Sequence, residues 1–253
     1  MSVSLSALQA QIDAWLQPST ISDYCPNGLQ VQGREQVQRL VTGVTASQAL
    51  IDAALAADAD AILVHHGYFW KGENPCITGI KKRRLLSLLN ADVSLLAYHL
   101  PLDLHSEYGN NVQLAQRLGF EVSGPLDTSA RQSVGLQGRL AQPLSAAQLC
   151  QRIATALGRE PQLIGDPERM ISSVGWCTGA AQGYIDQAVA AGLDAYLSGE
   201  ISEPTVHSAR ENDIAYFAVG HHASERYGVQ ALGDALAAQL GIEHHYIEVA
   251  NPV

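Results

Sequence analysis

Two adjacent histidines at the end of an apolar segment are the first residues that could do chemistry. His65 and His66 follow the run Ala61–Val64, which has the length and composition of a buried strand. Imidazole nitrogen is a good ligand for borderline divalent metals. Neighbouring side chains on an extended backbone point in opposite directions, so the pair could serve two ions only if the strand ends there, and Gly67 permits that turn. A surface histidine pair without a role is the alternative.

A second pair of candidate ligands has helical spacing. His221 and Glu225 are four residues apart, so a helix would place both on one face, one turn apart. Such a pair makes half of a metal site, although pairs of this kind also occur by chance. Asp103 adds a hard oxygen ligand after another apolar run, Val93–Tyr98.

Further histidines lie beside these candidates. We expect His99 and His222 to orient a ligand or substrate, or to act as general base or acid. His244 and His245 belong to a C-terminal strand with one buried face, where a structural role is expected.

An internal repeat predicts the elements that position these residues. Residues 48–63 (QALIDAALAADADAIL) and 182–197 (QGYIDQAVAAGLDAYL) are identical at nine of sixteen positions, at a constant offset of 134. Alanine-rich helices can resemble each other by chance. However, each copy follows a short β-like run and leads into a buried strand, and each half then reaches a second apolar run followed by His99-x-x-x-Asp103 or His221-x-x-x-Glu225.

The repeat predicts an α/β fold made of two similar α/β domains with mixed sheets, residues 1–125 and 126–253. The C-terminal part of the second could pack on the first. One helix is well delimited, with Ser145 as N-cap and Gly158 after its last periodic residue. The ends of strands in such folds usually bind ligands.

Charge and composition exclude several classes of protein. A net charge of −10 disfavours nucleic acid as a partner, and the basic run Lys81–Arg84 is expected to be a solvated helix face. The four cysteines show no C-x-x-C spacing, so neither a zinc knuckle nor a disulfide framework is indicated. Met1–Leu16 predicts an amphipathic helix rather than a signal peptide, and no apolar stretch is long enough to span a membrane. We therefore expect a cytoplasmic protein.

Four segments resemble the signature motifs of the Nif-three-like family, in particular its bacterial YbgI-like branch, often labelled GTP cyclohydrolase 1 type 2 homologues. They are Ile21–Val31 (ISDYCPNGLQV), Val64–Trp70 (VHHGYFW), His99–Asp103 (HLPLD) and Gly220–Arg226 (GHHASER). The resemblance runs from about Ile21 to Pro252 and is weakest between residues 121 and 170.

The resemblance implies a ring-shaped homohexamer of two-domain chains, with a dinuclear metal site in each chain. Its ligands map onto His65, His66, Asp103, His221 and Glu225, with Glu225 bridging the two ions. His65 and His221 would then bind one ion, and His66 and Asp103 the other. The ions could be zinc, iron, manganese or nickel.

Two functional classes are compatible with such a site. The first is a metal-dependent hydrolase of the GTP cyclohydrolase type 2 kind, acting on a purine nucleotide or a phosphoester. The second is a non-catalytic protein that holds metal or senses a metabolite and hands metal or ligand to a partner. No phosphate loop is present, so a nucleotide would be held by other means.

The repeat also selects Glu200 and His207 as residues near the site. Glu200 is the counterpart of His66, at the end of a predicted strand. His207 lies four residues after Glu203 in a helix that Pro204 starts. We expect Glu200 and His207 to contact ligands or substrate without binding metal; a capping carboxylate with a solvent-facing histidine is the alternative.

Overall fold

The computed structural model describes residues 1–253, and the chain divides into two compact units. The first unit comprises residues 1–108 and 228–250, and the second comprises residues 109–227 and 251–253. This boundary differs from the predicted one at residue 125. Residues 120–125 form a strand that pairs within the second unit, and residues 243–246 form a strand that pairs within the first.

The first unit is built from short strands alternating with helices. Its elements are β1 (Val3–Ser4), α1 (Leu5–Leu16), η1 (Pro18–Thr20), β2 (Gly28–Val31), β3 (Gln36–Val37), β4 (Arg39–Thr45), α2 (Gln48–Ala56), β5 (Ala61–His66), α3 (Gly79–Ala91), β6 (Ser94–Ala97), α4 (Leu100–Leu104), most of α9 (His221–Leu240) and β13 (Glu243–Tyr246).

Its main sheet has the order β13-β4-β5-β6-β2. The first four strands are parallel, and β2 pairs with β6 in the antiparallel direction. β1 and β3 form a separate antiparallel pair. Because parallel strands need a crossover between them, the chain returns through helices that cover both faces of the sheet.

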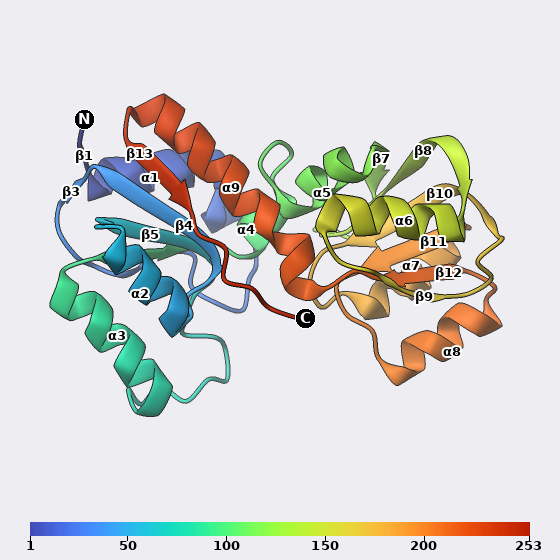
Figure 1. Cartoon of the computed structure of the whole chain (residues 1–253), viewed down its shortest axis with the longest axis horizontal. Helices are drawn as coiled ribbons and strands as arrows, with labels where there is room; N and C mark the ends of the chain where they lie inside the picture. The colour runs from blue at the N-terminus through green and yellow to red at the C-terminus, as the bar shows by residue number, and fades with distance from the viewer. The chain divides into compact units, whose positions relative to one another are not determined.

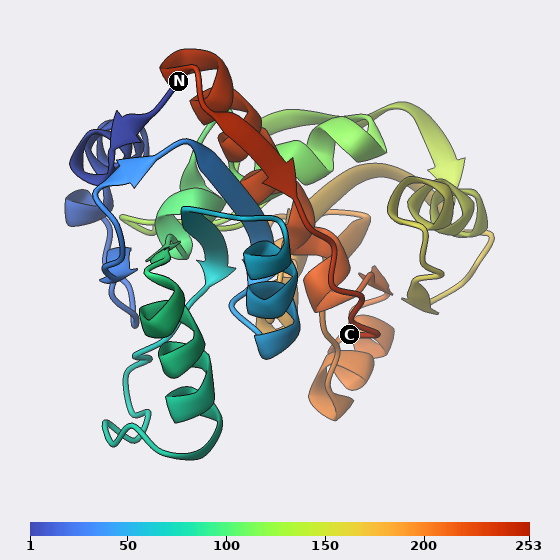
Figure 2. The same ribbon diagram turned by 60° about the vertical axis from the view of Figure 1, so that its left-hand side comes forward.

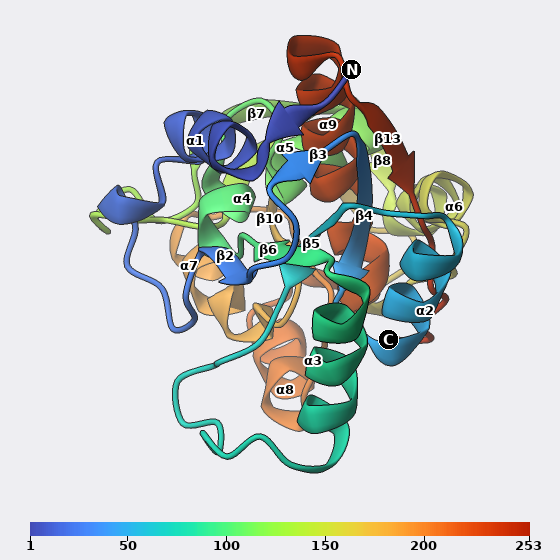
Figure 3. The same ribbon diagram turned by 90° about the vertical axis from the view of Figure 1, so that its left-hand side faces the viewer.

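Side-chain alternation along β5 shows how the two faces are filled. Leu63 packs with apolar residues of α1 and α9, whereas Ile62 packs with those of α2 and α3. Figures 1 and 3 show α1 and α9 on one face of the sheet and α2 and α3 on the other, and Figure 2 shows α2 and α3 side by side. The first unit is therefore a three-layer α/β/α structure.

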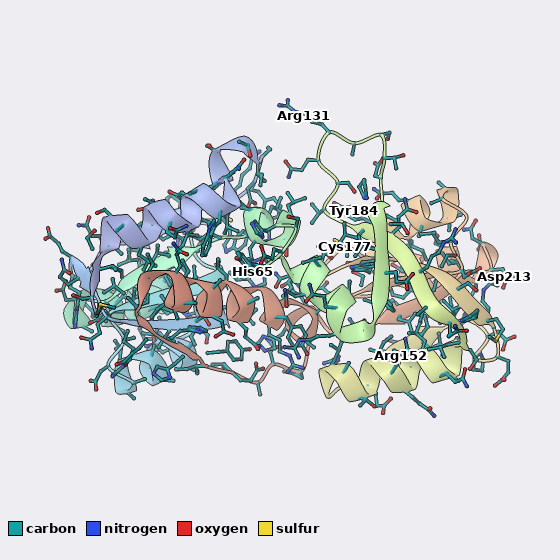
Figure 4. All side chains as sticks on the ribbon, turned by 90° about the horizontal axis from the view of Figure 1, so that it is seen from above. His65, Arg131, Arg152, Cys177, Tyr184 and Asp213 are labelled. Carbon is teal, nitrogen blue, oxygen red and sulfur yellow. The ribbon has the colours of Figure 1, made fainter.

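The second unit repeats this plan. Its elements are α5 (Asn110–Leu118), β7 (Phe120–Pro125), β8 (Leu136–Ser145), α6 (Ala146–Leu157), β9 (Gln162–Ile164), β10 (Met170–Cys177), η2 (Gln182–Tyr184), α7 (Ile185–Ala190), β11 (Ala195–Ser198), α8 (Glu203–Glu211), β12 (Ala215–Ala218) and the start of α9. The loop between β7 and β8 carries Arg131 near its tip (Figure 4).

The sheet of the second unit has the order β7-β8-β10-β11-β12-β9, with β10, β11 and β12 parallel and the other pairs antiparallel. Leu197 packs with α5 and α6, and Tyr196 packs with α7 and α8. Mixed sheets in a layered α/β fold are what the sequence predicted, and that prediction is confirmed.

The strand register supports the internal repeat. Leu40 of β4 pairs with Ala61 of β5, and Val174 of β10 pairs with Ala195 of β11. Each residue of the second pair lies 134 positions after its counterpart in the first pair. Leu63 and Leu197 consequently occupy the same place in their sheets. The similarity of residues 48–63 and 182–197 thus reflects equivalent structure rather than shared alanine content.

Several local predictions are confirmed. α1 covers the predicted N-terminal helix, and none of the helices is long and apolar enough to cross a membrane. The Lys81–Arg84 run lies on α3; Lys82 and Arg83 are exposed as predicted, whereas the Lys81 side chain is only 10% exposed and pairs with Glu73. His244 joins Thr42 and Asp234 through its two ring nitrogens, which is a structural role. None of the four cysteines forms a disulfide.

The limits of α6 also agree with the prediction. The Ser145 hydroxyl accepts the Gln148 N–H while the Gln148 side chain accepts the Ser145 N–H, and Gly158 ends the helix at φ 66°.

Ser145→Ala should lower the free energy of unfolding of the second unit by about 1 kcal/mol, because an orphan helix N–H loses its acceptor. Urea denaturation followed by circular dichroism measures the change. Ser172→Ala is the matched control: Ser172 is exposed, so its replacement should change stability by less than about 0.5 kcal/mol. Equal effects of the two changes would contradict the capping role.

Candidate metal centre

The end of β5 brings His65 and His66 close together despite their opposite directions on the strand. His65 is fully buried and is marked in Figure 4, whereas His66 is half-buried. Their ring centroids lie 4.5 Å apart. The strand ends at His66, and Gly67 is required there because a Cβ would lie 2.6 Å from the Cβ of Ala97. Gly67 is therefore needed for close packing at the strand end; it is not in the left-handed conformation that a glycine-specific turn would use.

The ends of the next elements in the first unit add two more groups. His99 follows β6, and its ring centroid lies 5.0 Å from that of His65 and 5.8 Å from that of His66. Asp103 lies on α4, with its Oδ1 3.6 Å from Nε2 of His65, and both side chains are buried. Asp103 is therefore grouped with His65, whereas the family resemblance had assigned it to the ion of His66. His65, His66 and His99 each offer a ligand atom, and these atoms lie within 4.8 Å of one another. This cluster could hold a metal ion.

The second unit carries His221 and Glu225 on the first turns of α9. Nε2 of His221 lies 3.0 Å from Oε2 of Glu225, as the four-residue spacing predicts. Glu225 is buried, and the backbone at Gly179 lies against it, since a Cβ there would be 2.1 Å from its Oε1. The carboxylate and the imidazole thus form a compact pair of potential ligands.

The imidazoles share one hydrogen-bonding pattern that suits metal binding. Nδ1 of His65 donates to the Tyr98 carbonyl (3.0 Å), and Nδ1 of His221 donates to Oε1 of Glu200 (2.7 Å). Nδ1 of His66 is hydrogen-bonded to the Thr45 hydroxyl (3.1 Å). Metal-binding histidines almost always have one ring nitrogen held in this way, which leaves the other nitrogen as the ligand. The donor set therefore fits a divalent metal through Nε2.

The electrostatics of His221 favour a positive charge beside the two carboxylates. Burial lowers the pKa of His221, but the hydrogen bonds and charges of Glu225 and Glu200 outweigh burial and raise it to about 9. In metal-free protein near neutral pH, the His221 ring is therefore protonated on both nitrogens and positively charged. A divalent cation would supply the same compensation for the buried Glu225 charge.

The remaining predicted site residues have different surroundings. Glu200 contacts the candidate ligand His221. His207 lies instead on the exposed surface of α8, where its Nε2 is 3.0 Å from Oε1 of Glu203. This is the solvent-facing histidine of the alternative interpretation, and we assign His207 no role at the metal centre. His222 is buried and follows His221 on α9, about 100° further around the helix.

Asp23 lies in one of the four motif segments, but its residue type and spacing indicate no role. Oδ1 of Asp23 accepts a hydrogen bond from Nδ1 of His99 at 2.9 Å. No local spacing could have indicated this pair, because 76 residues separate the two side chains. The Tyr98 carbonyl that holds His65 leaves no signal in residue type at all.

A cavity of about 410 Å³ in the second unit lies beside the loops that touch the His221–Glu225 pair. Its lining includes Gln182, Asp186, Thr205 and Ser208 but no lysine or arginine. Such a cavity suits an uncharged polar group better than a phosphate.

Comparison with known proteins identifies the family. The family described as Duf34/NIF3 (NGG1p interacting factor 3) matches residues 3–252 of the chain. The chain belongs to this family. The resemblance noted in the sequence is therefore confirmed.

Individual members of the Duf34/NIF3 family are similar over their whole length. A relative from Pseudomonas aeruginosa named GTP cyclohydrolase 1 type 2 homolog is 63% identical over 252 residues, with 100% of both chains covered. One of the same name from Vibrio cholerae is 53% identical, over 97% of this chain and 98% of the relative. The solved structure titled protein ybgI, unknown function, has a TM-score of 0.95 at 47% identity and covers 99% of this chain and 100% of that one.

For this Duf34/NIF3 chain, Glu200→Gln should weaken divalent-metal binding by about 10–100-fold, because His221 would lose the carboxylate that orients its ring. Competition for zinc with a chromophoric chelator measures the affinity. Glu203→Gln is the matched control, since Glu203 is 82% exposed and bonded to His207. Equal affinities of the Glu200 variant and the wild type would show that Glu200 does not orient a ligand.

Proposed function

We propose that the chain is a metal-dependent hydrolase that binds two divalent ions through His65, His66, Asp103, His221 and Glu225. The observation that supports this most is the shared orientation of the imidazoles: each Nδ1 atom is hydrogen-bonded, and Nε2 would be the atom that binds the ion. The proposed bridging role of Glu225 rests on the family resemblance. Zinc, iron, manganese and nickel all suit this donor set.

The proposed reaction is the hydrolysis of a purine nucleotide or a phosphoester. Two divalent ions supply Lewis acidity and lower the pKa of water, which provides a nucleophile near neutral pH. For a purine, the water oxygen bonds to the carbon between the two imidazole nitrogens, one C–N bond breaks, and the departing nitrogen takes a proton. We assign to His99 the role of accepting the proton of the water, because its ring lies beside those of His65 and His66. His222 is the second candidate for proton transfer.

Glu225→Gln should lower the occupancy of both metal ions, because a neutral amide is a poor bridge between two cations. Elemental analysis of untagged protein measures the number of ions per chain. His207→Ala serves as the control and should keep two ions, since His207 is exposed and paired with Glu203. Two tightly bound ions in the Glu225 variant would contradict the bridging assignment.

Turnover of GTP and of bis(4-nitrophenyl) phosphate distinguishes the hydrolase from a metal-holding protein. We expect the metal-loaded protein to hydrolyse at least one of them. Binding of metal without turnover of either would favour the metal-holding or metabolite-sensing function.

We also propose that the chain forms a ring-shaped homohexamer. Besides the family resemblance, apolar side chains around α3 support self-association: Ile77, Ile80, Leu86 and Leu89 are each 49–59% exposed. In analytical ultracentrifugation, wild-type protein should sediment as a hexamer and Leu89→Glu as smaller species. A monomeric wild type would overturn this proposal.

A further inference from the structure

The segment Asp23–Asn27 has no role in the proposed function, yet it holds His99 from two sides. Oδ1 of Asp23 accepts from Nδ1 of the His99 ring at 2.9 Å, and Oδ1 of Asn27 accepts from the His99 backbone N–H at 2.7 Å. Nδ2 of Asn27 in turn donates to Oδ2 of Asp23 at 2.9 Å. One short loop therefore fixes both the ring and the backbone of His99.

Each oxygen of the Asp23 carboxylate accepts two hydrogen bonds. Besides His99 and Asn27, the donors are the backbone N–H groups of Tyr24 (2.7 Å) and Leu100 (2.9 Å). The Asp23 side chain is 3% exposed. Burial raises the pKa of Asp23, but the hydrogen bonds and the His99 charge outweigh burial and lower the pKa to about 2. Asp23 is thus an ionised, immobile acceptor.

An acceptor at Nδ1 determines which nitrogen of His99 carries the proton. A carboxylate cannot donate, so Nδ1 carries the hydrogen and the lone pair of a neutral ring is on Nε2. The ring also contacts Trp70, with the centroids 5.0 Å apart and the planes nearly perpendicular. The rings of Tyr24, His65 and His66 also lie beside it.

Two other functions of this cluster are disfavoured by its chemistry. Asp23, Cys25 and His99 lie close enough to hold a metal ion, but both oxygens of Asp23 are already occupied by donors. A cysteine nucleophile is equally unsuitable, because burial and the charge of Asp23 raise the pKa of the Cys25 thiol to about 12.

We propose that Asp23 is a positioning residue that holds His99 in the Nδ1–H tautomer, with Nε2 available beside His65 and His66, and that Asn27 fixes the backbone of the same histidine. The proton-accepting role of His99 rests on the proposed function, whereas its tautomer does not. The arrangement repeats the relation between Glu200 and His221, in which a carboxylate also holds Nδ1. Here the oriented nitrogen serves proton transfer instead of metal binding.

The tautomer is measurable by ¹⁵N magic-angle-spinning NMR of the zinc-loaded, full-length protein labelled at histidine. His99→Gln identifies the His99 signals by difference. We expect wild-type His99 to be protonated at Nδ1 and unprotonated at Nε2. A wild-type ring protonated at Nε2 alone would overturn the proposal without any further variant.

Asp23→Asn should move the proton of His99 to Nε2. If the new amide kept its oxygen towards His99, its NH₂ group would face two donors, Asn27 and the Leu100 N–H. If the amide turns the other way, its NH₂ group faces only one donor, the Tyr24 N–H, and points at Nδ1 of His99. This orientation is therefore favoured. An unchanged His99 spectrum in this variant would contradict the positioning role.

Asp60→Asn is the matched control. Asp60 also accepts several donors, including the backbone N–H groups of Gln38 and Arg39, but it precedes β5 at the other end of the strand. Its replacement should leave the His99 signals unchanged. A shift as large as that of Asp23→Asn would mean that the effect is not specific to Asp23.

Hydrolysis of bis(4-nitrophenyl) phosphate gives the second readout. Asp23→Asn should lower kcat by about 10²–10⁴-fold with KM and the content of two ions unchanged, and adding His99→Gln should lower it no further. Full activity of Asp23→Asn would overturn the positioning role. If the wild type cleaves neither this probe nor GTP, the proposed hydrolase fails, while the NMR result still decides the role of Asp23.

Discussion

An imidazole ring presents a lone pair in a defined direction only while its other nitrogen is held. In this protein the groups that hold the rings come from neighbouring strand ends and loops: the Tyr98 carbonyl for His65, Thr45 for His66 and Glu200 for His221. Parallel strands in register bring their carboxyl ends to one edge, so β4, β5 and β6 can supply both ligands and holding groups. The layered fold thus places a hydrogen-bonding group beside Nδ1 of each of these histidines.

The two units use equivalent strand ends for different purposes. His65 and His66 in the first unit correspond to Gly199 and Glu200 in the second. A side chain at Gly199 is excluded, because its Cβ would lie 2.7 Å from the Gly179 carbonyl oxygen and from the His221 Cα. The second unit therefore offers a carboxylate that holds a ligand, where the first offers two ligands. The duplicated scaffold has kept its register while the chemistry of its edge has diverged.

What could be predicted from the sequence depended on local signals. Hydrophobic runs, caps and the 134-residue offset gave the strands, α6 and the repeat, and helical spacing gave the His221–Glu225 pair. The boundary between the units depends on β7 and β13, two short edge strands. β7 pairs with β8, the next strand in the chain, whereas β13 pairs with β4, which is far away in the sequence. Asp23 was missed because its contact with His99 is long-range, and His207 was selected because its spacing from Glu203 is the same for an exposed ion pair as for a site.

The return of the chain to the first unit also affects the order of folding during synthesis. The core of the first unit includes Val229, Leu232 and Leu236 of α9, and β13 pairs with β4 at the edge of its sheet. A nascent chain that has left the ribosome only as far as Tyr108 therefore lacks one covering helix and one strand of that unit. The second unit is nearly continuous from Gly109 to Tyr227, so almost all of its elements are synthesised before the last helix and strand of the first unit. The part of the protein that is made first is thus the part that is completed last.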